Sequence, residues 1–140
     1  MECGEIIKQY LLSLLTVFRK KIRGKKYTLS QILILSSIPH DGMDMTSLSD
    51  RVGVDNSTAT RLIGGLIKLG LISRKKDIND KRITLVSLTE KGELVSEEIE
   101  KKLDNVGEDI FNLIPFEKRE DIKESLLSFH WVLLKYNNSV

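Results

Sequence analysis

The segment Thr46-Ser-Leu-Ser-Asp-Arg-Val-Gly53-Val-Asp55, together with the residues that follow it to Gly70, has the pattern of a helix-turn-helix. Such a motif needs apolar or small side chains at fixed offsets around its turn, so that its two helices can pack together. With Gly53 as the turn residue, those positions are occupied by Leu48, Val52, Val54, Ala59 and Leu62. Glycine fits the turn because it adopts a positive φ without a Cβ clash. The segment therefore predicts two short helices joined by a glycine turn.

The second of these helices has a predicted start and end. Asp55 is a good N-cap residue because its carboxylate can accept hydrogen bonds from the free N–H groups of the first turn. Gly70 follows Lys68 and Leu69 in the place of a C′ glycine, with a cation in the last helical turn. Thr46 is the expected cap of the helix before it. Spacings of three and four predict a buried stripe of Ala59, Leu62, Ile63, Leu66 and Leu69.

The other face of the second helix carries short hydrogen-bonding side chains and cations. These are the side chains that contact base edges and phosphates in a major groove. The candidate DNA-contacting residues are Asn56, Ser57, Thr58, Thr60 and Arg61. A polar helix face is often only a solvated face, but here the glycine turn before it and a hairpin after it favour DNA binding.

A β-hairpin is predicted directly after this helix. Residues 71–75 and 83–87 are rich in β-branched side chains and alternate in part between apolar and polar residues. Residues 76–82 between them are polar and charged, which is typical of an exposed hairpin tip. A short strand at 43–45 is expected to pair with this hairpin.

Three short patterns in this region resemble the winged-helix core of the MarR family of bacterial and archaeal regulators. They are Gly-Leu-Ile-x-Arg at 70–74, Asp80-Lys81-Arg82, and Leu-Thr-x-x-Gly at 88–92. The match covers residues 46–92, and the combination of the three with the preceding helix-turn-helix is specific. The resemblance implies a mainly α fold: a winged helix-turn-helix with a small β-hairpin wing and an N- and C-terminal helical dimerisation region.

This resemblance also assigns roles to residues of the hairpin. In the family, the arginine of the Asp-x-Arg unit enters the minor groove and the aspartate braces it. Asp80, Lys81 and Arg82 are therefore the predicted DNA-binding residues of the wing, and Arg74 and Lys75 are predicted to contact DNA phosphates. The alternative for Asp80 and Arg82 is an exposed ion pair in a mobile loop, which contributes little to stability.

The helical flanks suggest assembly into a homodimer. Apolar residues keep helical spacing over residues 4–23, over 89–113 and after Pro115, where residues 116–136 form the expected last helix. Residues 28–38 between them start with the capping box Thr28-Leu-Ser-Gln31. The long apolar stripes have few partners within the chain, which favours a bundle shared between two subunits over packing within one.

Length and charge are consistent with one DNA-binding domain. We expect a single domain at residues 1–140, with the DNA-binding lobe at 28–92 and the dimerisation region at 1–26 and 93–140. Residues 46–92 carry nine cations and five anions, whereas residues 93–140 carry six cations and eleven anions. This asymmetry suits a nucleic-acid-binding lobe joined to a part that does not touch nucleic acid.

No residue pattern predicts an enzyme, a cofactor or a metal site. The single cysteine, Cys3, excludes an internal disulfide, and His40 and His130 share no ligand spacing. Gly64-Gly65 lies within a predicted helix and does not follow a strand, so it is not a phosphate-binding loop. No apolar run is long enough to span a membrane, and the N-terminus lacks a basic signal segment, so the expected location is cytoplasmic.

The sequence therefore predicts a homodimeric transcriptional regulator, with repression as the expected sign of control, that binds double-stranded DNA. A winged-helix protein–protein interaction module is the alternative. The family usually keeps an apolar cleft for a small apolar or aromatic effector. The candidate lining residues are Tyr10, Phe18, Tyr27 and Phe111. The pattern favours a plain core role over an effector contact for each of them.

Overall fold

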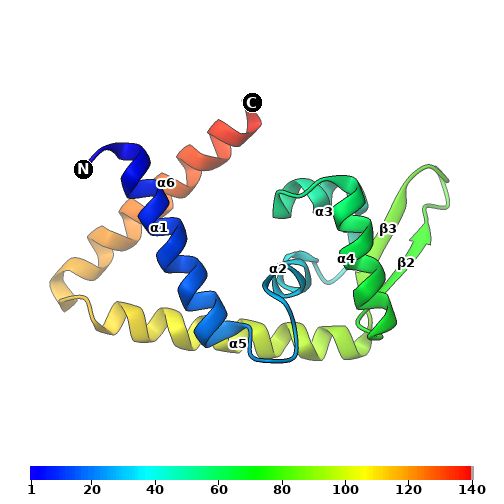
Figure 1. Ribbon diagram of the computed structural model, residues 1–140, viewed down its shortest axis with the longest axis horizontal. Helices are drawn as coiled ribbons and strands as arrows, with labels where there is room; N and C mark the ends of the chain where they lie inside the picture. Colours follow the sequence, from blue (N-terminus) through cyan, green and yellow to red (C-terminus); the bar gives the residue numbers. More distant parts are fainter. Residues whose placement is uncertain (140) are drawn as a thin grey trace. The chain divides into compact units, whose positions relative to one another are not determined.

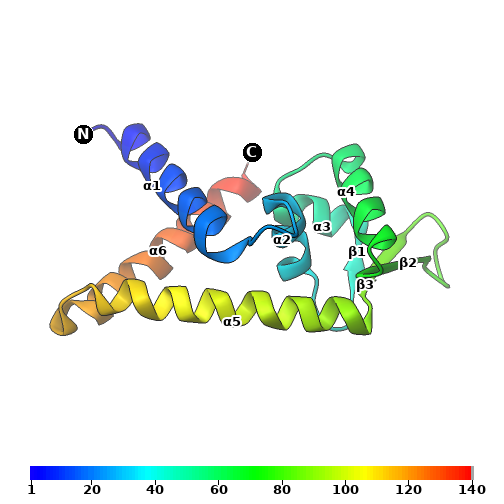
Figure 2. The same ribbon diagram turned by 60° about the horizontal axis from the view of Figure 1, so that its bottom comes forward.

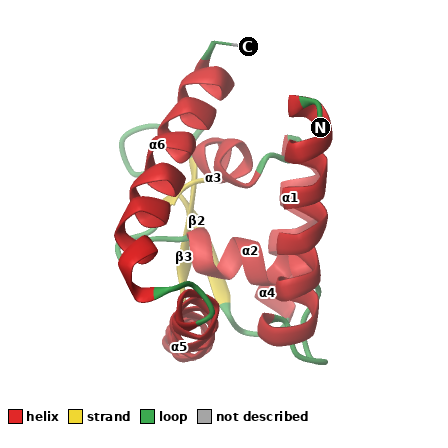
Figure 3. Ribbon diagram, turned by 90° about the vertical axis from the view of Figure 1, so that its left-hand side faces the viewer, coloured by secondary structure: helices red, strands yellow, loops and turns green. Residues whose placement is uncertain are grey.

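The computed structural model describes residues 1–139 and divides the chain into two compact units, Met1–Leu103 and Asp104–Val140. Helices account for most of both units, and the only sheet in residues 1–139 is small (Figure 3). The elements are, in chain order, α1 Cys3–Val17, a π-helical turn η1 Phe18–Ile22, α2 Leu29–Ser37, β1 Met43–Asp44, α3 Met45–Val52, α4 Asn56–Lys68, β2 Ile72–Lys76, β3 Thr84–Leu88, α5 Glu90–Asn112, a 3-10 turn η2 Phe116–Lys118 and α6 Arg119–Asn138 (Figure 1). The predicted mainly α winged helix-turn-helix is confirmed.

Side-chain caps fix where the first helices of the winged-helix lobe begin. The predicted capping box is present: Gln31 N donates to Thr28 Oγ1 at 3.2 Å, and Thr28 N donates to Gln31 Oε1 at 3.0 Å. The prediction of Thr46 as the cap of the next helix is wrong, because α3 starts two residues earlier. Asp44 is its N-cap, and its carboxylate accepts from both the N–H and the hydroxyl of Ser47. A carboxylate has two oxygens for these two donors, which a threonine hydroxyl lacks.

The turn between α3 and α4 has the predicted geometry. Gly53 has φ 72° and ψ 33°, in the left-handed region that favours glycine. Its N–H donates to Asp50 O, and the N–H of Val54 donates to Ser49 O, so two of the last four carbonyls of α3 find partners. Ser49 is itself buried, which lets the two helices cross closely.

The core of the first unit lies where α2, α3 and α4 meet. It contains Ile32, Ile34, Leu35, Leu48, Ala59, Ile63 and Leu66, each at most 1% exposed. The predicted stripe of α4 is correct at Ala59, Ile63 and Leu66, but Leu62 is only half-buried and Leu69 is 43% exposed. Leu69 lies beyond the last helical residue, where the chain turns at Gly70, so it leaves the buried face.

The sheet has the order β1-β3-β2, with antiparallel pairs throughout. The expected short strand is confirmed as β1, which pairs Met43 with Val86 at the base of the hairpin (Figure 2). Both hairpin strands begin one residue later than predicted. Leu71 is excluded from β2 because its N–H donates to Leu66 O and so completes the end of α4.

The first turn of α5 is fastened to the end of α4. Thr89 Oγ1 donates to Gly70 O at 2.6 Å, Thr89 N donates to Leu71 O at 3.0 Å, and Lys91 Nζ donates to Leu69 O at 3.2 Å. Thr89 Oγ1 also accepts from Gly92 N, as predicted for the cap of this helix. Gly92 lies against the Leu71 carbonyl so closely that a Cβ there would overlap it. These contacts explain the Leu-Thr-x-x-Gly pattern physically.

The terminal helices α1 and α6 are amphipathic, but their apolar faces are not buried. None of the residues Cys3–Val17 and Arg119–Asn138 is buried. On α1 the exposed apolar residues include Ile7, Tyr10, Leu11 and Leu14, each about half exposed. On α6 they include Leu126, Leu127, Phe129, Trp131 and Val132. In the second unit, Arg119 Nε donates to Ile114 O at 2.9 Å and so closes the turn before α6.

Candidate nucleic-acid interface

The N-terminus of α4 is organised by its cap residue. Asp55 Oδ1 accepts from Thr58 N at 2.6 Å and from Ser57 Oγ at 2.8 Å. The hydrogen bond from the Thr58 N–H, followed by that from Ser57, lowers the pKa of Asp55 below its ordinary value of 3.8. A charged carboxylate at this position also complements the positive end of the helix. The first turn of α4 is thus held rigidly by its own side chains.

The predicted DNA-contacting residues of α4 differ in which side-chain hydrogen-bond donors and acceptors are already used within the protein. The Ser57 hydroxyl donates to Asp55, and Thr60 Oγ1 donates to Asn56 O at 2.8 Å, so both present acceptor lone pairs. Thr58 is half-buried, whereas Asn56 and Arg61 are exposed. Within residues 1–139 the side chains of Asn56 and Arg61 make no hydrogen bond, so all their donors remain available.

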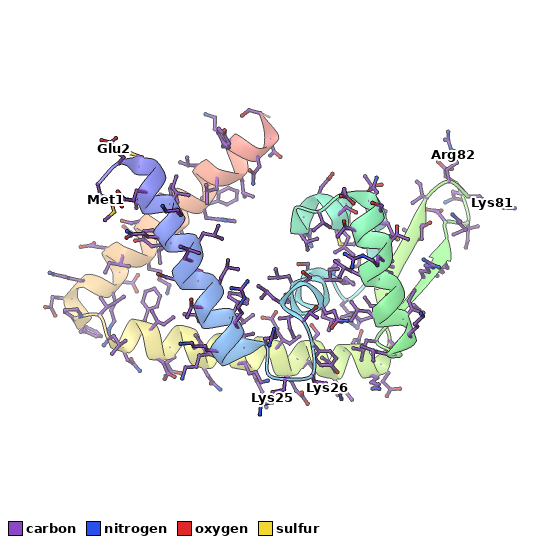
Figure 4. The ribbon with its side chains drawn as sticks, viewed as in Figure 1. Met1, Glu2, Lys25, Lys26, Lys81 and Arg82 are labelled. Atoms are coloured by element: carbon purple, nitrogen blue, oxygen red, sulfur yellow. The ribbon has the colours of Figure 1, made fainter. Side chains whose placement is uncertain are left out.

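The wing presents one arginine from a well-ordered tip. Arg82 Nε donates to Asp80 Oδ1 and Arg82 Nη2 to Asp80 Oδ2, both at 3.1 Å, and the Arg82 main-chain N–H donates to Asp80 Oδ1 at 3.0 Å. The Arg82 side chain is nevertheless 91% exposed, against 33% for Asp80. Figure 4 shows Lys81 and Arg82 at the tip of the hairpin, directed away from the rest of the lobe. The aspartate therefore orients the guanidinium without covering it.

The charge pair is coupled electrostatically as well as by geometry. The hydrogen bonds from the Arg82 side chain and N–H lower the pKa of Asp80, and the Asp80 carboxylate raises the pKa of Arg82. The tip is closed further by Asp77, whose Oδ1 accepts from Asn79 N and whose N–H donates to Ile83 O. The loop therefore holds its own conformation around the ion pair.

The fold brings the wing and α4 to the same clefts. One cleft of about 520 Å³ is lined by Asn56 and Thr60 of α4 and by Arg82 and Thr84 of the hairpin. A second, of about 390 Å³, joins Thr60 to Arg74 and Lys75 of β2. The two predicted groups of DNA-binding residues therefore form one continuous surface.

Sequence reasoning missed several residues of this surface. Thr46 and Thr84 line the larger cleft, and Lys76 and Thr84 line the smaller one, where Lys76 Nζ donates to Thr84 Oγ1 at 3.1 Å. The pair is directly opposite in the hairpin register, Lys76 with Thr84. Only the correct register could have identified this pair, and the predicted strands began one residue too early.

The proposed effector residues are divided between the two units. In the first unit, Tyr10 is 57% exposed, and Phe18 and Tyr27 are half-buried. Phe111 belongs to the second unit, where it lines a cleft of about 320 Å³ with Arg119 and Lys123. Each unit thus contains part of the predicted set.

The remaining chemistry of residues 1–139 is limited. No group of three or more His, Cys, Asp or Glu side chains in that range could hold a metal ion, and no helix there is long and apolar enough to cross a membrane. Cys3 is exposed near the start of α1.

A helix-turn-helix followed by a β-hairpin with a projecting arginine defines a winged-helix DNA-binding protein. The family model of the MarR family matches residues 27–84. The HTH-type transcriptional regulator SarZ of Staphylococcus saprophyticus is 32% identical over 127 residues, which cover 89% of this chain and 80% of SarZ. The chain belongs to the MarR family and is a transcriptional regulator of that family.

Solved structures share the fold over almost the whole chain. A MarR regulator from Methanosarcina mazei Go1 is 28% identical, with a TM-score of 0.82 over 94% of this chain and 99% of its own. FabT of Streptococcus pneumoniae, solved in complex with DNA, has a TM-score of 0.78 at 19% identity and covers 95% of this chain and 99% of its own. NadR, solved with 4-hydroxyphenylacetate, has a TM-score of 0.75 at 25% identity and covers 92% of each chain.

Proposed function

We propose that this regulator acts as a homodimeric repressor that binds a pseudo-palindromic operator. The observation that carries the proposal is the oriented, 91% exposed Arg82 on the same cleft as Asn56 and Thr60. With α4 in a major groove, the wing lies over the adjacent minor groove. A narrow minor groove has an enhanced negative potential and accepts a guanidinium well.

The homodimer is supported by the terminal helices. α1 and α6 each leave several large apolar side chains exposed, and contiguous exposed apolar surface marks protein–protein contacts. In this proposal, residues 28–92 bind DNA, and residues 1–26 and 93–140 form the dimer interface. Two recognition helices related by a two-fold axis require half-sites separated by about one helical turn, roughly 10 bp.

Control by a small apolar or aromatic molecule is the second part of the proposal. NadR, a structural neighbour, was solved with the aromatic acid 4-hydroxyphenylacetate. In the first unit, the half-buried aromatic side chains of Phe18 and Tyr27 are the candidate contacts. A ligand that binds the DNA-free conformation more tightly than the DNA-bound one would release the operator.

Selection from a random duplex library with the full-length protein tests this function. The enriched duplexes should contain inverted half-sites about 10 bp apart. Filter binding of the enriched duplex and of a random duplex at two salt concentrations should show weaker binding at the higher salt, because phosphate contacts release counterions. Absence of both binding and salt sensitivity would instead indicate a protein–protein interaction module.

A further inference from the structure

Two adjacent glycines lie in the interior of α4, where no packing within residues 1–139 requires them. A Cβ built on Gly64 meets no atom of residues 1–139 within 4 Å, apart from its own helix and chain neighbours. A Cβ on Gly65 meets only Gln31 Nε2, at an ordinary contact distance of 3.8 Å. Both positions have ordinary helical φ, since neither is among the glycines with positive φ. Alanine would therefore stabilise the helix at either site.

The two glycines differ in the direction they face. An α-helix turns by about 100° per residue, so Ser57, Thr60 and Lys68 lie within about 40° of Gly64 around the helix axis. All three are exposed, and the buried residues Ala59, Ile63 and Leu66 lie on the other side. Gly65 is turned by a further 100°, toward Gln31 of α2. Gly65 is about 80°, 140° and 60° from Ser57, Thr60 and Lys68, respectively, so Gly64 is the glycine at the centre of this exposed face.

We propose that Gly64 sets how deeply the recognition helix enters the major groove, by placing bare main chain against the DNA between Arg61 and Lys68. This inference rests on the proposed function. A helix with its side chains is about 10–12 Å across, and the major groove is about 12 Å wide. A single methyl group on the innermost face therefore displaces the helix and the side chains that contact the bases.

This arrangement explains why a destabilising residue occupies the site. Stability alone would favour alanine, whereas close approach of another backbone is a situation in which glycine is needed. Since no part of residues 1–139 makes that approach to Gly64, the approaching group comes from the bound partner. Arg61 and Lys68, on either side, are placed to contact phosphates of that partner.

The test compares Gly64→Ala with Gly65→Ala in the full-length protein. The probes are a labelled duplex enriched by the wild-type protein from a random library, and a random duplex of the same length. Gly64→Ala should raise the Tm by about 2–4 °C, weaken binding of the enriched duplex at least about tenfold and leave binding of the random duplex within about threefold. Gly65→Ala should raise the Tm similarly and bind both duplexes like the wild type.

The possible outcomes separate this inference from the function on which it rests. If Gly64→Ala binds the enriched duplex as the wild type does, or if both variants lose affinity equally, Gly64 is not a point of close approach. Equal loss would indicate that the flexibility of the glycine pair matters instead. Failure of the wild-type protein to bind any duplex would refute the proposed function and this inference together.

Discussion

At the scale of single residues, Arg82 shows how a loop side chain can be prepared for binding. An exposed arginine loses rotamer freedom when it enters a groove, and this loss opposes binding. Asp80 restricts the Arg82 side chain beforehand through two hydrogen bonds of 3.1 Å to the guanidinium. The ion pair is exposed, so its main effect falls on orientation and little of it on stability.

Replacing this arginine should therefore separate DNA binding from stability. Arg82→Ala should weaken binding of the selected operator at least about tenfold, because the minor-groove contact is lost, with Tm and dimerisation almost unchanged. Asp80→Ala should weaken binding less, by disordering Arg82. Fluorescence anisotropy at physiological salt measures the operator affinity of both variants. Lys81→Ala is the control, because it removes a neighbouring cation. Wild-type affinity of Arg82→Ala would show that the wing does not read the groove.

Gly92 is a single residue on which the stability of the fold depends. Its N–H donates to Thr89 Oγ1, and its α-carbon lies against the Leu71 carbonyl group, which also accepts from Thr89 N. No side chain fits between the start of α5 and the end of α4. The glycine thus allows the recognition helix and the long helix to be joined by hydrogen bonds.

We expect Gly92→Ala to lower the free energy of unfolding by about 1–3 kcal/mol, since the methyl group must displace main-chain atoms. Urea denaturation measures this change. Gly107→Ala is the matched control in the same helix, because a Cβ there meets nothing within 4 Å in residues 1–139. The control should be neutral or more stable by up to about 1 kcal/mol. Equal behaviour of the two variants would contradict the proposed close contact.

At the scale of elements, α4 depends on the ionised state of its cap. The hydrogen bonds of Thr58 and Ser57 to Asp55 lower the pKa of the carboxyl below 3.8 in the folded protein. The contribution of this cap to stability is therefore fully present above pH 3.8 and is lost as the pH falls below 3.8 through the pKa of the folded state.

Comparison with Asp55→Asn should reveal this pH dependence. Asparagine is also a good N-cap residue, but it does not titrate. The stability of the wild type relative to Asp55→Asn should therefore be constant at about pH 5–7 and should fall below about pH 3.8. Urea denaturation of both proteins over this range measures the difference, and other titrating groups cancel because both proteins contain them. A difference independent of pH would show that the charge of Asp55 does not stabilise the helix.

At the scale of the whole molecule, the terminal helices leave large apolar side chains exposed. Leu126 of α6 is 46% exposed, and Trp131 on the same helix is 67% exposed. A second copy of the chain is the partner we propose, and the two DNA-binding lobes then share one operator. Dimerisation and specific binding should accordingly be lost together.

Leu126→Asp tests this coupling. A carboxylate in an apolar interface should weaken the dimer by at least about 3 kcal/mol, more than a hundredfold, because the charge must be desolvated. Sedimentation should then show a monomer at micromolar concentration, and binding of the palindromic operator should be lost. Leu126→Met keeps the apolar volume and should remain dimeric. A wild-type protein that sediments as a monomer would refute the proposed dimer.

Much of the winged-helix lobe could be predicted from the sequence because its signals are local. The capping box of Thr28, the positive φ of Gly53 and the end of α4 at Gly70 each depend on hydrogen bonds within six residues. Both partners of each bond lie in the same short segment, so the segment itself indicates the bond. The Asp80–Arg82 pair is equally local, and its functional role stays a prediction.

Only the tertiary structure decided how distant residues meet. The register of the two hairpin strands depends on how they pair with each other and with β1. The clefts join Thr60 to the hairpin residues Arg74 and Thr84, which are 14 and 24 positions away in the sequence. Gly92 contacts Leu71, which is 21 positions away. No local pattern encodes such contacts, because they exist only once the core of α2, α3 and α4 has packed and has set the place of the hairpin.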